Sequence, residues 1–135
     1  MEYQNKISQN ILWNFGKQKF LTIENFRLAL KNYNEEIRGE FFSEDLDLPI
    51  LKANKVAIQY EYWDQSIEDI VEPDFLLNAD NGQFFTTAEL LFKIHNQVHE
   101  KLKDDDHQFF EGLELWTGEN PNYPDTPLYF LQQGS

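Results

Sequence analysis

The stretch Lys55-Val56-Ala57-Ile58-Gln59-Tyr60-Glu61-Tyr62-Trp63 alternates between two sets of side chains. Val56, Ile58, Tyr60 and Tyr62 fall on every second position, which is the period of a strand that buries one face. β-branched and aromatic residues also suit the pleated surface of a sheet. We therefore predict a strand over 55–63 and a sheet at the centre of the fold.

Further strand signals follow along the chain. A short apolar run predicts a strand over 74–78, and Asp80-Asn81-Gly82 supplies the positive φ angle of a tight turn, after which 83–85 would pair back. Two more strands are expected over 108–116 and 127–132, separated by a loop over 117–125 that contains one glycine and two prolines.

The first helix is predicted over 22–38. Ile23, Phe26, Leu30, Tyr33 and Ile37 recur at steps of three and four residues, which places them on one helix face. The residue before this stripe, Thr22, is a suitable N-cap, and the Gly39 that follows is a suitable stop.

A second helix is predicted to begin at Thr86-Thr87-Ala88-Glu89. This order is a capping box, in which the side chains of Thr86 and Glu89 each bond to the other residue's backbone N–H. The expected core stripe is Leu91, Ile94, Val98 and Leu102, and the run Asp104-Asp105-Asp106 marks the exit from the helix.

Two regions give weaker patterns. The aromatic run over 11–15 favours a short strand, with a helix over 4–14 as the alternative. Residues 40–54 are expected to form an ordered loop, because Pro49 lacks a backbone N–H donor.

The elements together predict the fold class. Few helices stand among short, hairpin-like strands, without regular alternation of strand and helix. The expected fold is α+β, a mainly antiparallel sheet with two principal helices packed on one face, and residues 1–135 form a single domain.

Charge is the most informative feature of the composition. The chain has 24 Asp and Glu against 11 Lys and Arg, a net charge of −13. Residues 1–38 hold six bases and four acids, whereas 56–92 and 104–135 contain no Lys or Arg. Such a surface repels nucleic acids and acidic membranes and attracts cationic proteins. The alternative interpretation is that the charge serves only solubility.

Motifs for chemistry are missing from the sequence. There is no Cys, the six glycines stand singly, and no serine lies in a G-x-S-x-G motif. His95 and His99 are four residues apart and could face one zinc ion, but no third ligand accompanies them, so we expect partly exposed helix residues. We predict no enzymatic activity, no catalytic residue, no cofactor and no metal. Neither a signal peptide nor a membrane span is recognisable, so a cytoplasmic location is expected.

Aromatic residues interleaved with acids suggest where a protein partner would bind, because interfaces favour aromatic anchors while charge steers the encounter. The alternative is that these rings complete the core. The candidate partner-binding residues form two groups: Glu61, Tyr62, Trp63, Asp64, Glu68 and Asp69, and then Glu111, Glu114, Trp116, Glu119 and Tyr123.

Four later segments stand out together: 75–86, which contains Ala79-Asp80-Asn81-Gly82, and then 89–96, 109–115 and 128–135. Over about residues 56–135 the chain resembles small bacterial immunity proteins of polymorphic toxin and contact-dependent growth inhibition systems. The resemblance implies a cytosolic antidote that blocks a cognate toxin domain, often a nuclease. It carries over no individual binding residue.

Two other functions remain open at this point. An acidic chain can act as a nucleic-acid mimic, for example an anti-restriction or other anti-defence protein whose carboxylates imitate phosphates. A small enzyme that uses two of the many carboxylates is the other alternative. Regular carboxylate spacing on an elongated surface would favour the mimic, whereas a compact acidic patch around a few aromatic residues would favour the inhibitor. A deep pocket would favour the enzyme.

Overall fold

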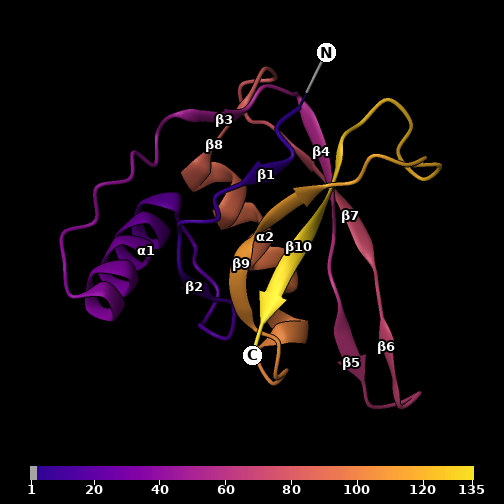
Figure 1. The fold of residues 1–135 in the computed structure, drawn as a ribbon, viewed down its shortest axis with the longest axis horizontal. Helices are drawn as coiled ribbons and strands as arrows, with labels where there is room; N and C mark the ends of the chain where they lie inside the picture. The colour runs from indigo at the N-terminus through magenta and orange to yellow at the C-terminus, as the bar shows by residue number, and fades with distance from the viewer. Residues whose placement is uncertain (1–2) are drawn as a thin grey trace.

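The computed structural model describes residues 3–135, and its centre is a six-stranded sheet (Figure 1). β10 pairs with β4 in parallel, and every other pairing is antiparallel. This architecture confirms the predicted α+β class. Five strands follow the order β1 (Lys6–Ile7), β9 (Phe109–Leu115), β10 (Leu128–Gly134), β4 (Lys55–Gln59) and β7 (Asp74–Asn78), and β2 (Trp13–Asn14) also pairs with β9.

The stretch over 55–63 forms strand structure as predicted, but in two parts. β4 ends at Gln59, and β5 (Tyr62–Asp64) pairs with β6 (Asp69–Val71) in a separate two-stranded sheet. Since β6 leads into β7, the four strands make one long hairpin whose distal half, β5 and β6, extends beyond the main sheet (Figure 1).

The two predicted helices are α1 (Ile23–Arg38) and α2 (Thr87–Leu102). Thr22 and Thr86 are their N-caps, and Gly39 ends α1 in the left-handed conformation, with a φ of 67°. α2 lies behind the main sheet, and α1 lies beside it (Figure 1), in contact with α2 and β2.

The predicted face of α1 is wrong at its C-terminal end. Ile37 is 60% exposed, whereas Asn34 is only 1% exposed. The Asn34 amide accepts from the backbone N–H of Leu12 and donates to the Leu12 carbonyl, both at 2.8 Å. Asn34 therefore pairs with the N-terminal segment as a neighbouring strand would, which a search for apolar periodicity does not detect.

Two predicted connections also differ in the structure. Residues 40–54 contain the strand β3 (Pro49–Leu51), and β8 (Phe85–Thr86) pairs with β3 rather than back onto 74–78. Pro49 is the first residue of its strand, a position that tolerates the missing N–H donor.

The capping box of α2 is half formed. Thr86 Oγ1 accepts from the Glu89 N–H at 3.1 Å, as predicted. The Glu89 carboxylate instead accepts from the Asp80 N–H and from Lys93 Nζ, both at 2.8 Å. Glu89 thus joins the 79–82 turn to α2, and Gly82 closes that turn with a φ of 72°.

The N-terminal segment enters the core as a short strand, and the alternative of a helix over 4–14 is wrong. Trp13 and Phe15 are buried. The Trp13 ring meets Phe26 edge-on at 5.1 Å between centroids and His95 at 5.5 Å. These contacts join β2, α1 and α2 in one hydrophobic cluster.

Candidate functional site

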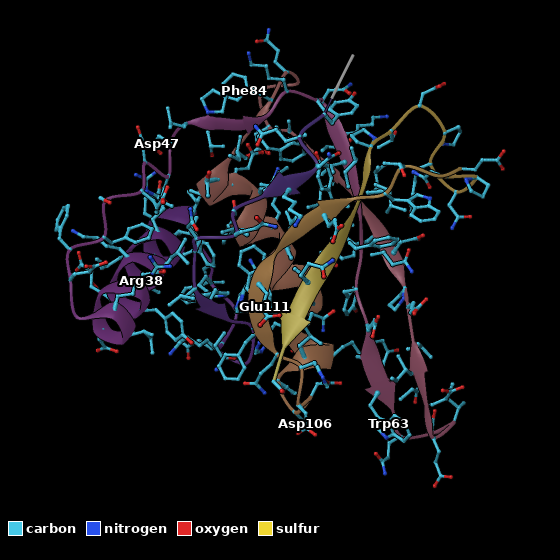
Figure 2. The ribbon with its side chains drawn as sticks, in the orientation of Figure 1. Arg38, Asp47, Trp63, Phe84, Asp106 and Glu111 are labelled. Carbon is cyan, nitrogen blue, oxygen red and sulfur yellow. The ribbon has the colours of Figure 1, made fainter. Side chains whose placement is uncertain are left out.

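The structure places the candidate partner-binding residues in three regions. The first group lies on the β5–β6 hairpin, at one end of the long hairpin (Figure 1), whereas the loop over 116–127 lies at the opposite end of the sheet. Glu111 and Glu114 lie between these ends, on β9. Figure 2 shows Trp63 and Asp106 at the lower end of the molecule and Glu111 at its centre. The two groups thus do not form one compact patch.

A concave site lies beside the hairpin, with a volume of about 510 Å³. We call it the hairpin pocket. One wall comes from Glu61 and the β5–β6 hairpin that follows it, and it contains the predicted residues Glu61, Tyr62 and Trp63. The other wall comes from the end of α2 and the turn before β9. The lining residues are Glu61, Tyr62, Trp63, Gln65, Ile70, Lys101, Asp104, Asp105, Asp106 and His107.

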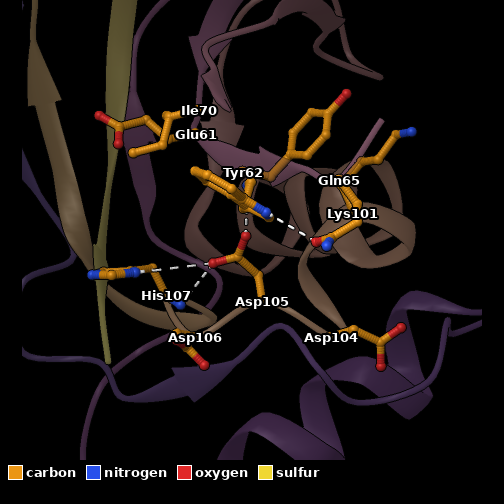
Figure 3. A pocket seen from close by; sticks show the side chains of 10 residues that line it. Glu61, Tyr62, Gln65, Ile70, Lys101, Asp104, Asp105, Asp106 and His107 are labelled. Carbon is orange, nitrogen blue, oxygen red and sulfur yellow. Dashed lines mark hydrogen bonds and ion pairs between the residues drawn. The ribbon is translucent and has the colours of Figure 1, made fainter. Parts of the chain in front are cut away.

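Asp105 connects the two walls of the hairpin pocket. Its side chain is 8% exposed. One carboxylate oxygen accepts from the Trp63 backbone N–H and the other from the His107 backbone N–H, each at 2.8 Å (Figure 3). Since a carboxylate that accepts backbone N–H groups makes strong hydrogen bonds, Asp105 fixes the hairpin against the end of α2.

Gln133 provides a second connection where β5 diverges from β10. Its amide accepts from the Glu61 N–H at 2.8 Å and donates to the Glu61 carbonyl at 2.9 Å. The same Nε2 donates to the His107 carbonyl at 2.8 Å. One side chain thus supplies the hydrogen bonds that a continued strand would give, and it holds the base of the hairpin.

The tip of the hairpin is ordered by Asp64. Its carboxylate accepts from the Ser66 hydroxyl at 2.6 Å and from the Ser66 N–H at 2.9 Å. These bonds, together with the charge of Lys101, keep the pKa of Asp64 below its usual range. Asp64 is therefore a fixed negative charge at neutral pH.

Packing on β10 orders the second group of predicted residues. The Trp116 ring lies 5.5 Å from that of Phe130, and its Nε1–H donates to the Glu119 carbonyl at 2.9 Å. Asn120 donates to the carbonyls of Tyr123 and Thr126 at 3.0 and 3.1 Å. These contacts order the loop over 116–127, and the Trp116 side chain is 43% exposed.

The negative charges near the hairpin are poorly compensated. Within residues 3–135, no Lys or Arg forms an ion pair with any of the predicted acidic residues. Arg27 pairs with Asp47, Lys93 with Asp80 and Glu89, and Lys103 with Glu100. Lys101 Nζ lies 5.1 Å from the centroid of the Tyr62 ring, a cation–π contact.

His95 and His99 are buried rather than partly exposed, so that prediction is wrong. His95 Nδ1 accepts from Trp13 Nε1–H at 3.0 Å, and Nε2–H donates to the Gln18 carbonyl at 2.8 Å. His99 donates from Nδ1 to the Phe15 carbonyl at 3.2 Å. Burial lowers the pKa of His95 to about 4. Both rings hold the N-terminal segment against α2, and the described residues contain no group of three potential metal ligands.

Sequence reasoning missed the wall formed by Asp104, Asp105 and Asp106, which it interpreted only as the exit from a helix. The run did signal a chain reversal. Nothing in the sequence signals that Asp105 meets Trp63, 42 positions away. Gln133 carries no signal either, because its partner Glu61 is 72 positions away.

Comparison with known protein families, with curated proteins and with solved structures gave no match to this chain. None of the helices formed by residues 3–135 has the length and apolar character needed to cross a membrane.

Proposed function

We infer that this chain is an immunity-type protein of the cytoplasm, which binds a cognate basic toxin domain and blocks its active site. The toxin domain is proposed to be a nuclease, because an active site that holds phosphates is cationic and attracts an acidic inhibitor. The chain acts by occlusion and performs no chemistry in this proposal.

One observation carries the proposal: within residues 3–135, no Lys or Arg forms an ion pair with the predicted acidic residues beside the exposed aromatic rings. Trp63 and Trp116 are 50% and 43% exposed next to such acids. Since exposed aromatic residues anchor interfaces and uncompensated charge accelerates encounter, the surface suits a cationic protein. Of the bases in residues 1–38, Arg27 pairs with Asp47 and Arg38 bonds to the Asn10 carbonyl. Lys6 lies directly opposite Glu114 in the β1–β9 pair, but the two side chains, both in the part of the chain that the structure describes, form no ion pair.

Co-expression with the toxin domain encoded next to this chain tests the proposal. The toxin domain alone should arrest growth, and the chain should restore it. The purified pair should form a complex in which the nuclease activity is lost. An unrelated chain of equal size and charge serves as the control. Growth arrest that persists despite soluble expression of both proteins would refute the proposal, as would equal protection by the control.

A binding assay separates this function from the nucleic-acid mimic. A mimic would compete with duplex DNA for many unrelated DNA-binding proteins, because its carboxylates replace phosphates in general. The immunity protein should bind its own toxin domain and leave unrelated cationic nucleases active. Broad inhibition of unrelated nucleases would therefore favour the mimic.

A further inference from the structure

The β5–β6 hairpin exposes apolar side chains on an ordered support. Trp63 and Ile70 are direct cross-strand partners, so their side chains lie on the same face of the hairpin. They are 50% and 54% exposed, and Ile67 near the tip is 59% exposed. Exposed apolar residues surrounded by charged ones mark interaction sites.

The hairpin is held in place before any partner arrives. Asp105 bonds to the Trp63 backbone, Gln133 bonds to the Glu61 backbone, and Trp63 Nε1–H donates to Gln65 Oε1 at 3.0 Å. A surface that is already ordered loses less conformational entropy on binding. The indole of Trp63 is therefore a preformed wall of the pocket.

The charges around this wall favour a cationic occupant. Of the four pocket acids, Asp105 is engaged by two backbone N–H groups, and Glu61, Asp104 and Asp106 are exposed and form no ion pair within residues 3–135. Figure 3 shows Asp104 and Asp106 below Asp105. Glu61 lies on the opposite side of the pocket. The one Lys of the pocket, Lys101, lies over Tyr62. The pocket thus combines an apolar wall with a rim of excess negative charge.

We propose that the hairpin pocket receives an arginine side chain of the partner protein, with the guanidinium stacked on Trp63 and paired with carboxylates of the rim. Arginine fits this combination because its planar cation stacks on aromatic faces and pairs with carboxylates. A volume of about 510 Å³ accommodates such a side chain with part of its own backbone. This inference rests on the proposed function and specifies which part of the acidic surface makes the central contact.

The test uses the intact chain and N-acetyl-arginine methylamide as the probe, followed by ¹H–¹⁵N correlation spectra. The indole signal of Trp63 and the amides of 104–107 should shift and saturate, while the indole of Trp116 should not. The citrulline analogue has the same shape without the charge, and it should cause no saturable shift. Equal shifts with citrulline, equal shifts at Trp116, or no shift at Trp63 would overturn the proposal.

Variants complete the test. The pair Asp104→Asn and Asp106→Asn should weaken binding of the probe about fivefold to tenfold, as expected from loss of charge-assisted contacts. The pair Glu40→Gln and Glu44→Gln removes the same charge from exposed residues outside the pocket and should leave binding unchanged. Equal effects of the two pairs would show that only net charge matters and would overturn the proposal.

The toxin domain distinguishes failure of this inference from failure of the proposed function. If the domain binds the wild-type chain and the Asp104→Asn/Asp106→Asn variant equally well, the pocket is not the central contact, although the function stands. If the domain does not bind the wild-type chain at all, the proposed function fails.

Discussion

The N-terminal segment and the β5–β6 hairpin both carry polar and aromatic side chains. The N-terminal segment buries its aromatic side chains in the core, whereas the hairpin exposes Trp63 to solvent. Trp13 is buried, and its N–H donates to a buried His95. Trp63 is half exposed, and its N–H donates to an exposed Gln65. The first region satisfies its polar groups inside the molecule and contributes to stability. The second leaves its charges toward solvent and is available for binding.

The buried N-terminal segment should be the most sensitive to substitution. Trp13→Ala removes a buried ring that packs against Phe26, Tyr33 and His95. It should lower the free energy of unfolding by about 3–5 kcal/mol, because a large cavity forms in the core. Urea denaturation measures this. The matched control, Trp63→Ala, should cost less than about 1 kcal/mol, because the ring is half exposed; equal losses would contradict the comparison.

Acid should lower the stability of the fold through the buried His95. The pKa of His95 is lowered from 6.5 to about 4 by burial. Between these values the unfolded chain binds a proton that the folded chain does not, so stability falls as pH decreases through this window. The loss should reach about 3 kcal/mol. Urea titrations from pH 7 to pH 4 should show a weaker decline for His95→Gln, and an identical decline would exclude His95 as the cause.

The pairing of Asn34 with Leu12 gives the next effect. Asn34→Ala leaves the N–H and C=O of Leu12 without their amide partner and should destabilise the chain by about 2–3 kcal/mol. Asn32→Ala, at an exposed position of the same helix, should change stability by less than about 0.5 kcal/mol. Thermal denaturation of both variants checks the difference, and a small effect of Asn34→Ala would show that water replaces the amide.

Loss of the exposed acids of the β5–β6 hairpin and the preceding Glu61 should affect stability least. The triple change Glu61→Gln, Glu68→Gln and Asp69→Asn removes three exposed charges that form no ion pair within residues 3–135. Stability should change by less than about 0.5 kcal/mol, because these charges have no ion-pair partner to lose and the Asp69→Asn side chain keeps an oxygen that can accept from the Ile70 N–H. Denaturation midpoints test this expectation. A clear loss of stability would show that the acids serve the fold.

The same contrast explains what sequence could predict. Both helices, their caps and the strand β4 follow from local patterns. Thr22, Gly39 and Thr86, for example, act within one turn of their own position. Three other features depend on partners 22 to 82 positions away in the sequence. They are the hydrogen bonds of Asn34, the burial of His95 and the hydrogen bonds of Gln133 to Glu61. Long-range polar contacts follow no sequence period, so no sequence pattern predicts them.

The sequence predicts some residues of the candidate site but does not predict the pocket that they line. The interleaved aromatic and acidic residues of this segment predict Glu61, Trp63 and Asp64 as binding residues. Their second wall, 104–107, becomes adjacent only when the end of α2 meets the hairpin. The separation of the 116–127 loop from the hairpin likewise depends on strand order, which periodicity does not determine.

The association rate constant of the chain with its toxin domain, measured by stopped flow at several salt concentrations, tests whether the acidic surface guides binding. The wild-type rate constant should fall steeply with salt, because uncompensated charge accelerates encounter by about 10-fold to 10³-fold at low ionic strength. Glu61→Lys, Asp64→Lys, Glu114→Lys and Glu119→Lys combined should slow association and flatten this dependence. Unchanged rate constants at low salt would contradict the claim that these carboxylates form a docking surface for a cationic protein.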